Sequence, residues 1–172
     1  MALLAVTVLG TDRPGIVAEV TGYLSRLGGN LEDSTMTLLR GHFAMVLVVS
    51  TERALSDVEA ALAPVSADGS LDVSVRPVPE AGVAAVSGAP YLLSVHGGDR
   101  PGIVSSMLGV VAGVGGSVTD LTTRLSGDLY VLVAEVDLPT GTDVAALHRA
   151  LRVAAESLDV DVSLRPVDTD LL

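Results

Sequence analysis

The stretch GTDRPGIVAEV (residues 10–20) recurs, with changes, as GGDRPGIVSSM (residues 97–107). When the chain is shifted by 87 positions, 13 of the 29 residues from Gly10 to Leu38 are identical, among them the block Asp-Arg-Pro-Gly-Ile-Val. The last segments of the two copies agree as well, because LDVSVRPV (71–78) and VDVSLRPV (160–167) have the same alternation of apolar and polar residues. We infer a tandem duplication of a unit of roughly 80 residues.

Within each unit the hydrophobic period changes in a definite order. An apolar, β-branched run leads into the repeated turn, and helical spacing follows it. Two strands across a tight turn at Arg40–His42, a second helix and a closing strand complete the unit. The positions predicted to face inward are Ile16, Val20, Leu24 and Leu27, then Leu55, Val58, Leu62 and Val65, then Leu71, Val73 and Val75 in the first copy, with Ile103, Met107, Val111 and Val114, then Val144, Leu147, Leu151 and Leu158 in the second.

The order βαββαβ predicts an α+β protein made of two tandem ferredoxin-like units, each with two helices on one face of a four-stranded antiparallel sheet. We expect a first domain at residues 1–79, a linker at 80–89, a second domain at 90–168 and a tail at 169–172. The linker is predicted from its Ala, Gly and Ser content. Because one such unit leaves a sheet face or edge open, we also expect a homodimer.

Composition excludes several classes of protein. The 172 residues are 49% apolar, which favours a packed core, and they carry 21 acidic against 10 basic residues, a formal net charge of −11. This charge disfavours direct binding to nucleic acid and to anionic membranes. The start of the chain lacks a basic segment, and no apolar run approaches the roughly 18 residues of a membrane span. We expect a cytoplasmic protein with no cofactor, and the absence of cysteine excludes a disulfide framework.

The repeated turn allows two interpretations. With Pro14 placed at the first helical position, the N–H groups of Gly15, Ile16 and Val17 would point out of the helix start and form an anion site suited to a carboxylate. Asp12 would then receive an ammonium group, so the turn could bind both ends of an amino acid. The alternative is structural, because Asp often caps a helix and Gly often permits the bend before it.

The stretch from Gly10 to Ser50 resembles an ACT domain, and both copies resemble the tandem-ACT proteins of the glycine cleavage system transcriptional repressor family. The resemblance implies a ligand, usually an amino acid, at an interface between domains. It implies contacts from the loop after the first strand and from the start of the second strand. The ligand-binding residues implied are Thr11, Asp12, Arg13, Pro14, Gly15 and Ile16 with Asn30 and Leu31, and Gly98, Asp99, Arg100, Pro101, Gly102 and Ile103 in the second copy.

The two copies differ near the implied ligand. Asn30, whose amide can donate and accept, becomes the shorter Ser117, so we expect the first copy to be the better site. The histidines His42, His96 and His148 have no paired spacing that would predict a metal site, although His96, beside the second turn, could line a pocket. Asp33 and Asp120 occupy matched strand positions and are interpreted as solvated carboxylates. No catalytic motif is present.

We therefore expect a non-enzymatic regulatory protein that binds a small amino acid or related metabolite. The resemblance implies that it acts by contact with a protein partner, which is a transcription regulator of amino-acid metabolism or an enzyme. Two alternatives remain: a protein-interaction module that binds no ligand, and a regulatory subunit of a metabolic enzyme.

Overall fold

The chain divides into two compact units, Met1–Ala81 and Gly82–Leu172, and the computed structural model describes residues 1–79 of the first and 88–167 of the second. The first unit contains β1 (Ala2–Thr11), α1 (Ile16–Arg26), β2 (Asn30–Leu39), β3 (His42–Thr51), α2 (Leu55–Leu62), the 3₁₀-helix η1 (Ala63–Ser66) and β4 (Leu71–Pro77). The second contains β5 (Gly88–Gly98), α3 (Ile103–Gly113), β6 (Ser117–Ser126), β7 (Leu129–Pro139), α4 (Val144–Leu158) and β8 (Val160–Pro166). The predicted order of elements is confirmed in both copies.

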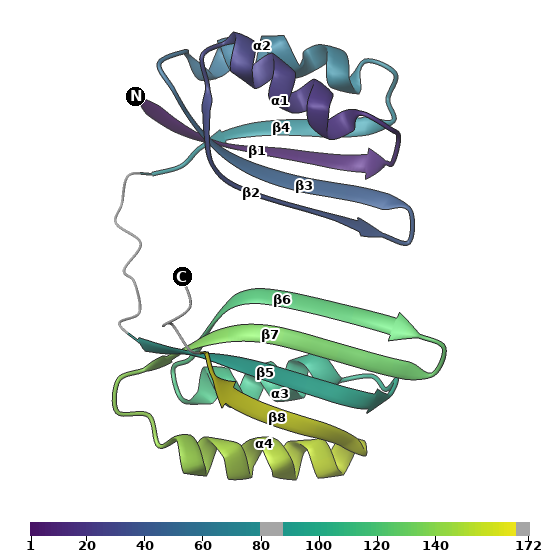
Figure 1. The fold of residues 1–172 in the computed structure, drawn as a ribbon, viewed down its shortest axis with the longest axis vertical. Coiled ribbons are helices and arrows are strands. Elements are labelled where there is room, and N and C mark those ends of the chain that lie inside the picture. Colours follow the sequence, from purple (N-terminus) through teal and green to yellow (C-terminus); the bar gives the residue numbers. More distant parts are fainter. Residues whose placement is uncertain (80–87, 168–172) are drawn as a thin grey trace. The chain divides into compact units, whose positions relative to one another are not determined.

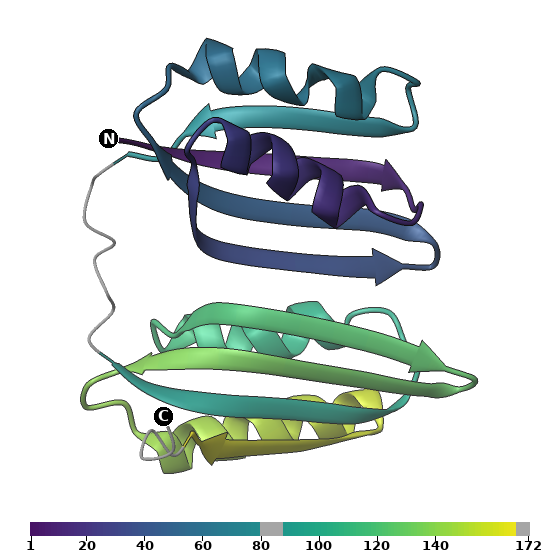
Figure 2. The same cartoon turned by 45° about the horizontal axis from the view of Figure 1, so that its top comes forward.

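Each unit has one antiparallel sheet, with strand order β2-β3-β1-β4 in the first and β6-β7-β5-β8 in the second. Both helices of a unit cover the same face of its sheet, and the other face carries no helix (Figures 1 and 2). This is the predicted ferredoxin-like fold. The hairpin between β2 and β3 turns at Arg40 and Gly41, which both have positive φ. Positive φ at two successive residues suits the right-handed twist of the flanking strands.

The core of each unit lies between its helices and its sheet, and it follows from the alternation of the strands. In β1, Leu4, Val6 and Val8 are buried and their neighbours are more exposed. On α1, Ile16, Val20 and Leu24 recur one turn apart and face these strand residues. The same pattern in α3 buries Ile103, Met107 and Val111. Each unit therefore has a hydrophobic core of its own.

Three predicted details are corrected. Val65 is buried as expected, but it lies in η1 and not in α2, because Pro64 cannot continue the hydrogen-bond ladder of the helix. Val114 follows the end of α3 and is exposed. Gly88 and Ala89, predicted to belong to the linker, are the first residues of β5, where Ala89 pairs with Leu138. The remaining linker residues, 80–87, and the predicted tail lie outside the described residues.

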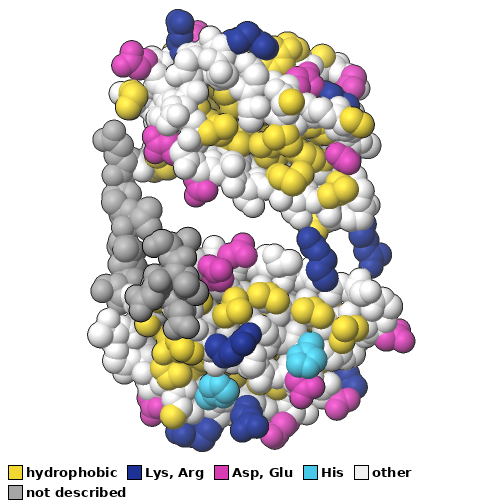
Figure 3. Space-filling model, in the orientation of Figure 1, with side chains coloured by type: hydrophobic (Ala, Val, Ile, Leu, Met, Phe, Trp, Pro, Cys, Tyr) yellow, Lys and Arg dark blue, Asp and Glu magenta, His cyan; other side chains and the backbone are white. Residues whose placement is uncertain are grey.

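The strands β2 and β6 lie at the edge of their sheets and are exposed along nearly their whole length. Leu31, Met36 and Leu38 share the face of the sheet that carries the helices, since they pair with the buried Val49, Met45 and Phe43. They nevertheless stay 42–48% exposed. Figure 3 shows apolar side chains gathered beside α1, over β2 and β3. On the side of the helices, the edge of the first unit thus exposes an apolar surface formed by these three side chains.

Candidate functional site

The repeated turn joins β1 to α1, and β5 to α3, in a conformation that differs from the predicted one. Helix α1 begins at Ile16, and Gly15 precedes it as the N-cap residue with φ +91°; Gly102 has φ +96° before α3. Pro14 therefore lies two residues before the helix and not at its first position. The left-handed conformation explains the glycine, because a side chain at this φ is strained.

The start of each helix presents free backbone donors. The first hydrogen bond into α1 is donated by Glu19 N–H to Gly15 O at 2.9 Å, and Ser106 N–H does the same to Gly102 O in α3. No side chain caps either helix. Within the described part of the chain, the N–H groups of Ile16, Val17 and Ala18 have no hydrogen-bond acceptor. These donors, at the positive end of the helix dipole, suit an anion such as a carboxylate.

Neither aspartate of the turn caps its helix, contrary to the structural interpretation. Both Asp12 and Asp99 are exposed, and neither carboxylate forms a hydrogen bond with another described residue. An aspartate that satisfied the helix start would accept from the second or third backbone N–H of that helix. The carboxylates are therefore free to bind a cationic group.

The arginine of each turn forms an ion pair, but with a different partner in each copy. Arg13 Nη2 lies 2.7 Å from Glu19 Oε2 on α1, whereas Arg100 Nη2 lies 2.7 Å from Asp159 Oδ2 at the end of α4. The difference follows from the sequence, since Ser106 occupies the position of Glu19 in the second copy. Both guanidinium groups are thus held by a carboxylate of their own unit.

A second loop touches the first turn. Thr11 N–H donates to Ser70 O at 2.9 Å, and Ser70 also donates its backbone and hydroxyl hydrogens to Asp68 Oδ1 at 2.9 and 2.7 Å. The hydrogen bond from the Ser70 hydroxyl lowers the pKa of Asp68, and the positive charge of Arg13 acts in the same direction. The loop before β4 therefore adds a stable negative charge beside the turn.

The second turn borders a pocket of about 320 Å³. Its lining includes Asp99, Gly102, the first residues of α3 and the half-buried Tyr130. The corresponding residue of the first unit is Phe43, which is 1% exposed and belongs to the core. Sequence reasoning missed Tyr130, although the shift by 87 positions shows the exchange of Phe for Tyr. A tyrosine hydroxyl would add a donor to a carboxylate site.

Asn30 and Leu31 do not join the turn of their own unit. Asn30 pairs with Ser50, which pairs with Leu3 near the start of β1. Thr11, at the other end of β1, is eight residues away from Leu3, which corresponds to about 27 Å at roughly 3.4 Å per residue. The cause is α1, which returns the chain to the far end of the sheet before β2 begins. Ser117 has the matching place in the second unit, opposite Asp137.

The histidines are separate from one another. His96 does not line the pocket at the second turn, and its Nε2 lies 3.6 Å from Asp161 Oδ2 on the exposed sheet face. His148 Nε2 lies 3.2 Å from Leu164 O. Among the described residues, no group of three or more histidine, aspartate and glutamate side chains could hold a metal ion. In the same residues, no helix has the length and apolar character needed to cross a membrane.

Comparison with known families matches each unit separately. The model of the ACT domain matches residues 2–76 and again residues 90–165. The chain belongs to the ACT domain family. It contains two ACT domains in tandem, and the repeated turns occupy the same strand-to-helix junction in both.

Two curated relatives show the range of similarity. The glycine cleavage system transcriptional repressor of Escherichia coli is 24% identical over 177 residues, covering 96% of this chain and 90% of that protein. A UPF0237 protein of Methanopyrus kandleri is 46% identical over 54 residues, which are 31% of this chain. The match spans 60% of the length of that relative.

Solved structures share the fold over nearly the whole chain. A protein from Galdieria sulphuraria described as unknown is 28% identical, with a TM-score of 0.82 and coverage of 96% of this chain and 98% of that one. A putative glycine cleavage system transcriptional repressor is 21% identical, with a TM-score of 0.70 and coverage of 96% and 97%. The second likeness concerns the fold alone.

Proposed function

We propose that this tandem ACT protein is a non-enzymatic regulator that binds a small amino acid or related metabolite and acts through contact with a protein partner. The family supports a regulatory role, and the relative from Escherichia coli is named a transcriptional repressor. The proposed partner is a transcription regulator of amino-acid metabolism. Direct binding to nucleic acid is not part of the proposal, because the net charge of −11 repels a phosphate backbone.

The observation that carries the proposal is the uncapped helix start behind each turn. The first three N–H groups of α1 lack an acceptor in the described structure, and neither helix is capped by a side chain. A ligand carboxylate would accept hydrogen bonds from these donors. Its ammonium group would pair with Asp12 in one copy or Asp99 in the other. Arg13 and Arg100, held in ion pairs, would leave these carboxylates available.

The ligand would also need a second ACT domain if Asn30 or Leu31 contacts it. These residues lie at the end of the sheet opposite to the turn of their own unit. A site that combines a turn with the start of a second strand therefore takes the two parts from different domains. Ligand binding in such a site would favour one arrangement of domains over others, by the difference between its affinities for them.

Protein contact would use the exposed edge strands. Leu31, Met36 and Leu38 on β2 are 42–48% exposed on one face of the sheet, and the described structure places no further strand beside this edge. Exposed apolar patches and open edges favour association with another protein or another copy. This surface supports both the proposed partner contact and the proposed homodimer.

The test is a thermal-shift titration of the full chain against each of the twenty amino acids. At 100 times its dissociation constant, a ligand should stabilise the folded protein by about 2.7 kcal/mol. At least one amino acid should raise the melting temperature. If none does, the ligand-binding part of the proposal is wrong and the ligand-independent interaction module is favoured.

The turn is tested by Asp12→Asn and Asp99→Asn, alone and together. Each substitution removes a charge that supports no helix, so the fold should be retained. The double variant should lose most of the thermal shift, because the ligand ammonium has no counter-charge. The matched control is Asp72→Asn on the exposed face of β4, which should keep the full shift. A double variant that responds like the wild type would exclude this site.

A further inference from the structure

The sheet of the first unit has one face that no helix covers, called the open face below, and its middle is apolar. Both helices lie on the opposite face (Figures 1 and 2). Residues that alternate with the buried core positions of the two central strands belong to the open face. Leu9 and Val46 are 42% and 41% exposed there. The middle of the open face consists of Ala5, Thr7 and Leu9 on β1 and Ala44, Val46 and Val48 on β3.

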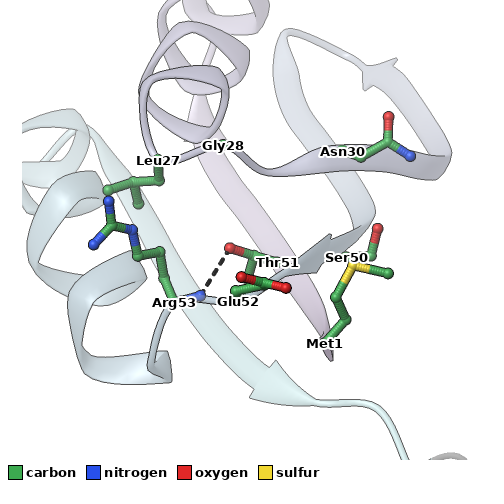
Figure 4. A pocket seen from close by; sticks show the side chains of 8 residues that line it. All are labelled: Met1, Leu27, Gly28, Asn30, Ser50, Thr51, Glu52 and Arg53. Carbon is green, nitrogen blue, oxygen red and sulfur yellow. Dashed lines mark hydrogen bonds between the residues drawn. The ribbon is translucent and has the colours of Figure 1, made fainter.

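The margins of the open face carry charges of both signs. Asp33 on β2 lies at one edge of the sheet, and Asp72 and Arg76 on β4 lie at the other. Neither Asp33 nor Arg76 forms an ion pair with another described residue. At one end of the strands the face is bounded by Asn30 and Ser50, which line the pocket drawn in Figure 4. The open face is therefore an apolar surface between two charged edges.

The strand register arranges the open face in rows that cross the sheet. Asp33, Val48, Ala5 and Arg76 form one such row, in the order β2, β3, β1 and β4. A two-fold axis that runs along the strands, midway between two such faces, lays β2 over β4 of a second copy and β3 over its β1. Each row then faces itself. The carboxylate of Asp33 would meet the guanidinium of Arg76 of the second copy, and symmetry would form this pair twice.

The same axis also matches large side chains with small ones. In each of three successive rows, a larger residue of β3 or β1 would face a smaller one of the second copy: Val48 over Ala5, Val46 over Thr7, and Leu9 over Ala44. Sheets that pack face to face need side chains that interdigitate in this way. A two-fold axis across the strands would instead stack Val46 on Val46 in the middle row. The register therefore favours the axis along the strands.

From this complementarity we propose that the open face of the first unit is the dimer contact of the protein, and that its occupant is the same face of a second copy. The inference rests on the proposed homodimer, but it assigns the dimer to the open face and leaves the β2 edge to the protein partner. Two four-stranded sheets then form a sandwich with an apolar interior. The two ion pairs between Asp33 and Arg76 at its margins fix the register of the two copies.

The second unit has the same rows but not the apolar middle. Glu135 occupies the place of Val48 in its open face, and His96 occupies the place of Leu9. Packing this face against another sheet would take the carboxylate of Glu135 out of water, which is unfavourable. The proposed contact is therefore specific to the first unit, and the second unit provides matched control positions.

The experiment is sedimentation equilibrium of the full chain over a wide range of concentrations. The wild type should dimerise. Val46→Arg places a charge in the middle of the contact and should raise the dissociation constant of the dimer by about a hundredfold or more. Val133→Arg, the same change at the matching position of the second unit, should leave the dissociation constant unchanged. A Val46→Arg variant that dimerises as tightly as the wild type would overturn the proposal.

An exchange of the two charges tests the register and does not alter the apolar middle. Asp33→Arg and Arg76→Asp should each weaken the dimer about tenfold, because each places like charges opposite one another. The double variant Asp33→Arg/Arg76→Asp restores opposite charges and should dimerise within about threefold of the wild type. With an axis across the strands, Arg76 would face Asp72 instead, and the double variant would not recover. A double variant weaker than both single variants therefore overturns the proposed arrangement.

The β2 edge is tested separately, so that failure of the open face can be told from failure of the proposed homodimer. Leu38→Asp alters the edge on the side of the helices and should leave the dimer intact. If Leu38→Asp abolishes the dimer while Val46→Arg keeps it, the open face is wrong and the homodimer belongs to the edge. A wild type that stays monomeric at every concentration contradicts both. Far-UV circular dichroism and a melting curve of each variant identify any loss that is due to unfolding.

Discussion

The two copies of the repeated turn have nearly the same backbone and different surroundings. Gly15 and Gly102 have φ of +91° and +96°, and no side chain caps either helix. The arginine partner, however, is Glu19 on the following helix in the first copy and Asp159 after α4 in the second. The duplicated units therefore preserve the conformation of the turn and have exchanged the residues that contact it.

The exchange changes what each turn can bind. Phe43 is part of the core in the first unit, while Tyr130 in the second is half-buried and lines a pocket beside the helix start. The sequence favoured the first copy because Asn30 is replaced by Ser117. The structure weakens that argument, because Asn30 is far from the first turn within its own unit. Two differences do border the turns: the partner of the arginine, and Tyr130 in the place of Phe43.

The largest effect on stability is expected at Gly10, where β1 lies directly against Ser70 and Leu71. A Cβ atom at Gly10 would lie 2.2 Å from Ser70 O and 2.9 Å from Leu71 Cα, at φ +149°. Gly10→Ala should lower the free energy of unfolding of the first unit by about 3–4 kcal/mol, because backbone must move. Hydrogen exchange measured by mass spectrometry reports the two units separately.

The matched change in the second unit is Gly97→Ala. Its Cβ atom would meet Val160 Cγ1 at 2.8 Å and Val160 Cα at 3.1 Å, with no positive φ to add strain. We expect about 1–2 kcal/mol, less than at Gly10, because part of the clash involves a side chain that can move. Gly98→Ala, with open space around it, is the control and should be almost neutral. If the two substitutions lowered the free energy of unfolding equally, the clash with backbone at Gly10 would be no more costly than the clash with Val160 at Gly97, and the account would be wrong.

The fold could be predicted from the sequence because its signals are local and occur twice. Helical spacing placed Ile16, Val20 and Leu24 in the core, and the alternation of the closing strand placed Leu71 and Val75 there. The end of α2 was missed because the spacing of Val65 continues through η1, and only the backbone shows that the hydrogen-bond ladder has changed.

The candidate site was less predictable, since it depends on dihedral angles and on contacts distant in sequence. Glycine adopts both signs of φ, so the residues alone did not decide where helix α1 begins. The partner of Arg100 is 59 positions away in the chain. The separation of Asn30 from the turn, by contrast, follows from the order strand, helix, strand, because an antiparallel return along α1 brings the chain to the opposite end of the sheet.

An exchange of the aromatic residues should separate stability from binding. Phe43→Tyr places a hydroxyl in the core of the first unit, and without a partner it should cost about 2 kcal/mol. Tyr130→Phe should leave the stability of the second unit nearly unchanged and weaken any ligand at the second turn. Urea unfolding and the thermal-shift titration measure the two effects. A Phe43→Tyr variant as stable as the wild type would show that the core around position 43 accommodates the tyrosine hydroxyl.

The turn glycines should give a smaller effect that is equal in the two units. At Gly15 nothing lies within 4 Å of an added Cβ atom, and at Gly102 the nearest atom is Ser105 Oγ at 3.9 Å. Gly15→Ala and Gly102→Ala should therefore each cost about 1 kcal/mol, which reflects the left-handed φ without a clash. Hydrogen exchange in α1 and α3 is the measurement. A difference above roughly 1 kcal/mol between the two variants would contradict the equivalence of the backbones.

The ion pairs of the turn arginines should have the smallest effect on stability. Arg13→Met and Arg100→Met should each change the free energy of unfolding by at most about 0.5 kcal/mol, because the paired groups are partly exposed and screened by solvent. The effect should decrease in 1 M salt, where the Debye length is about 3 Å. Urea unfolding at low and high salt checks this, and a large change that persists in high salt would indicate that packing is involved.

The pH dependence of stability should differ slightly between the units, because the first unit contains Asp68 with its lowered pKa. The Ser70 hydroxyl lowers the pKa of Asp68, so the folded state gains stability above the ordinary aspartate pKa and loses it as the pH falls through the lowered value. Ser70→Ala should raise the pKa of Asp68 toward its ordinary value and remove this contribution. Carboxyl NMR titration measures the shift. An unchanged pKa in the variant would show that the hydroxyl is not its cause.

The central claim is that the helix starts behind the repeated turns bind a small amino acid. The most direct test is an NMR titration of the ¹⁵N-labelled full chain with the amino acid that gives the largest thermal shift. We predict that the amide resonances of Ile16, Val17 and Ala18, or those of the first three residues of α3, move with saturation. Resonances of both helix starts that stay in place at saturating concentrations of all twenty amino acids would contradict the claim.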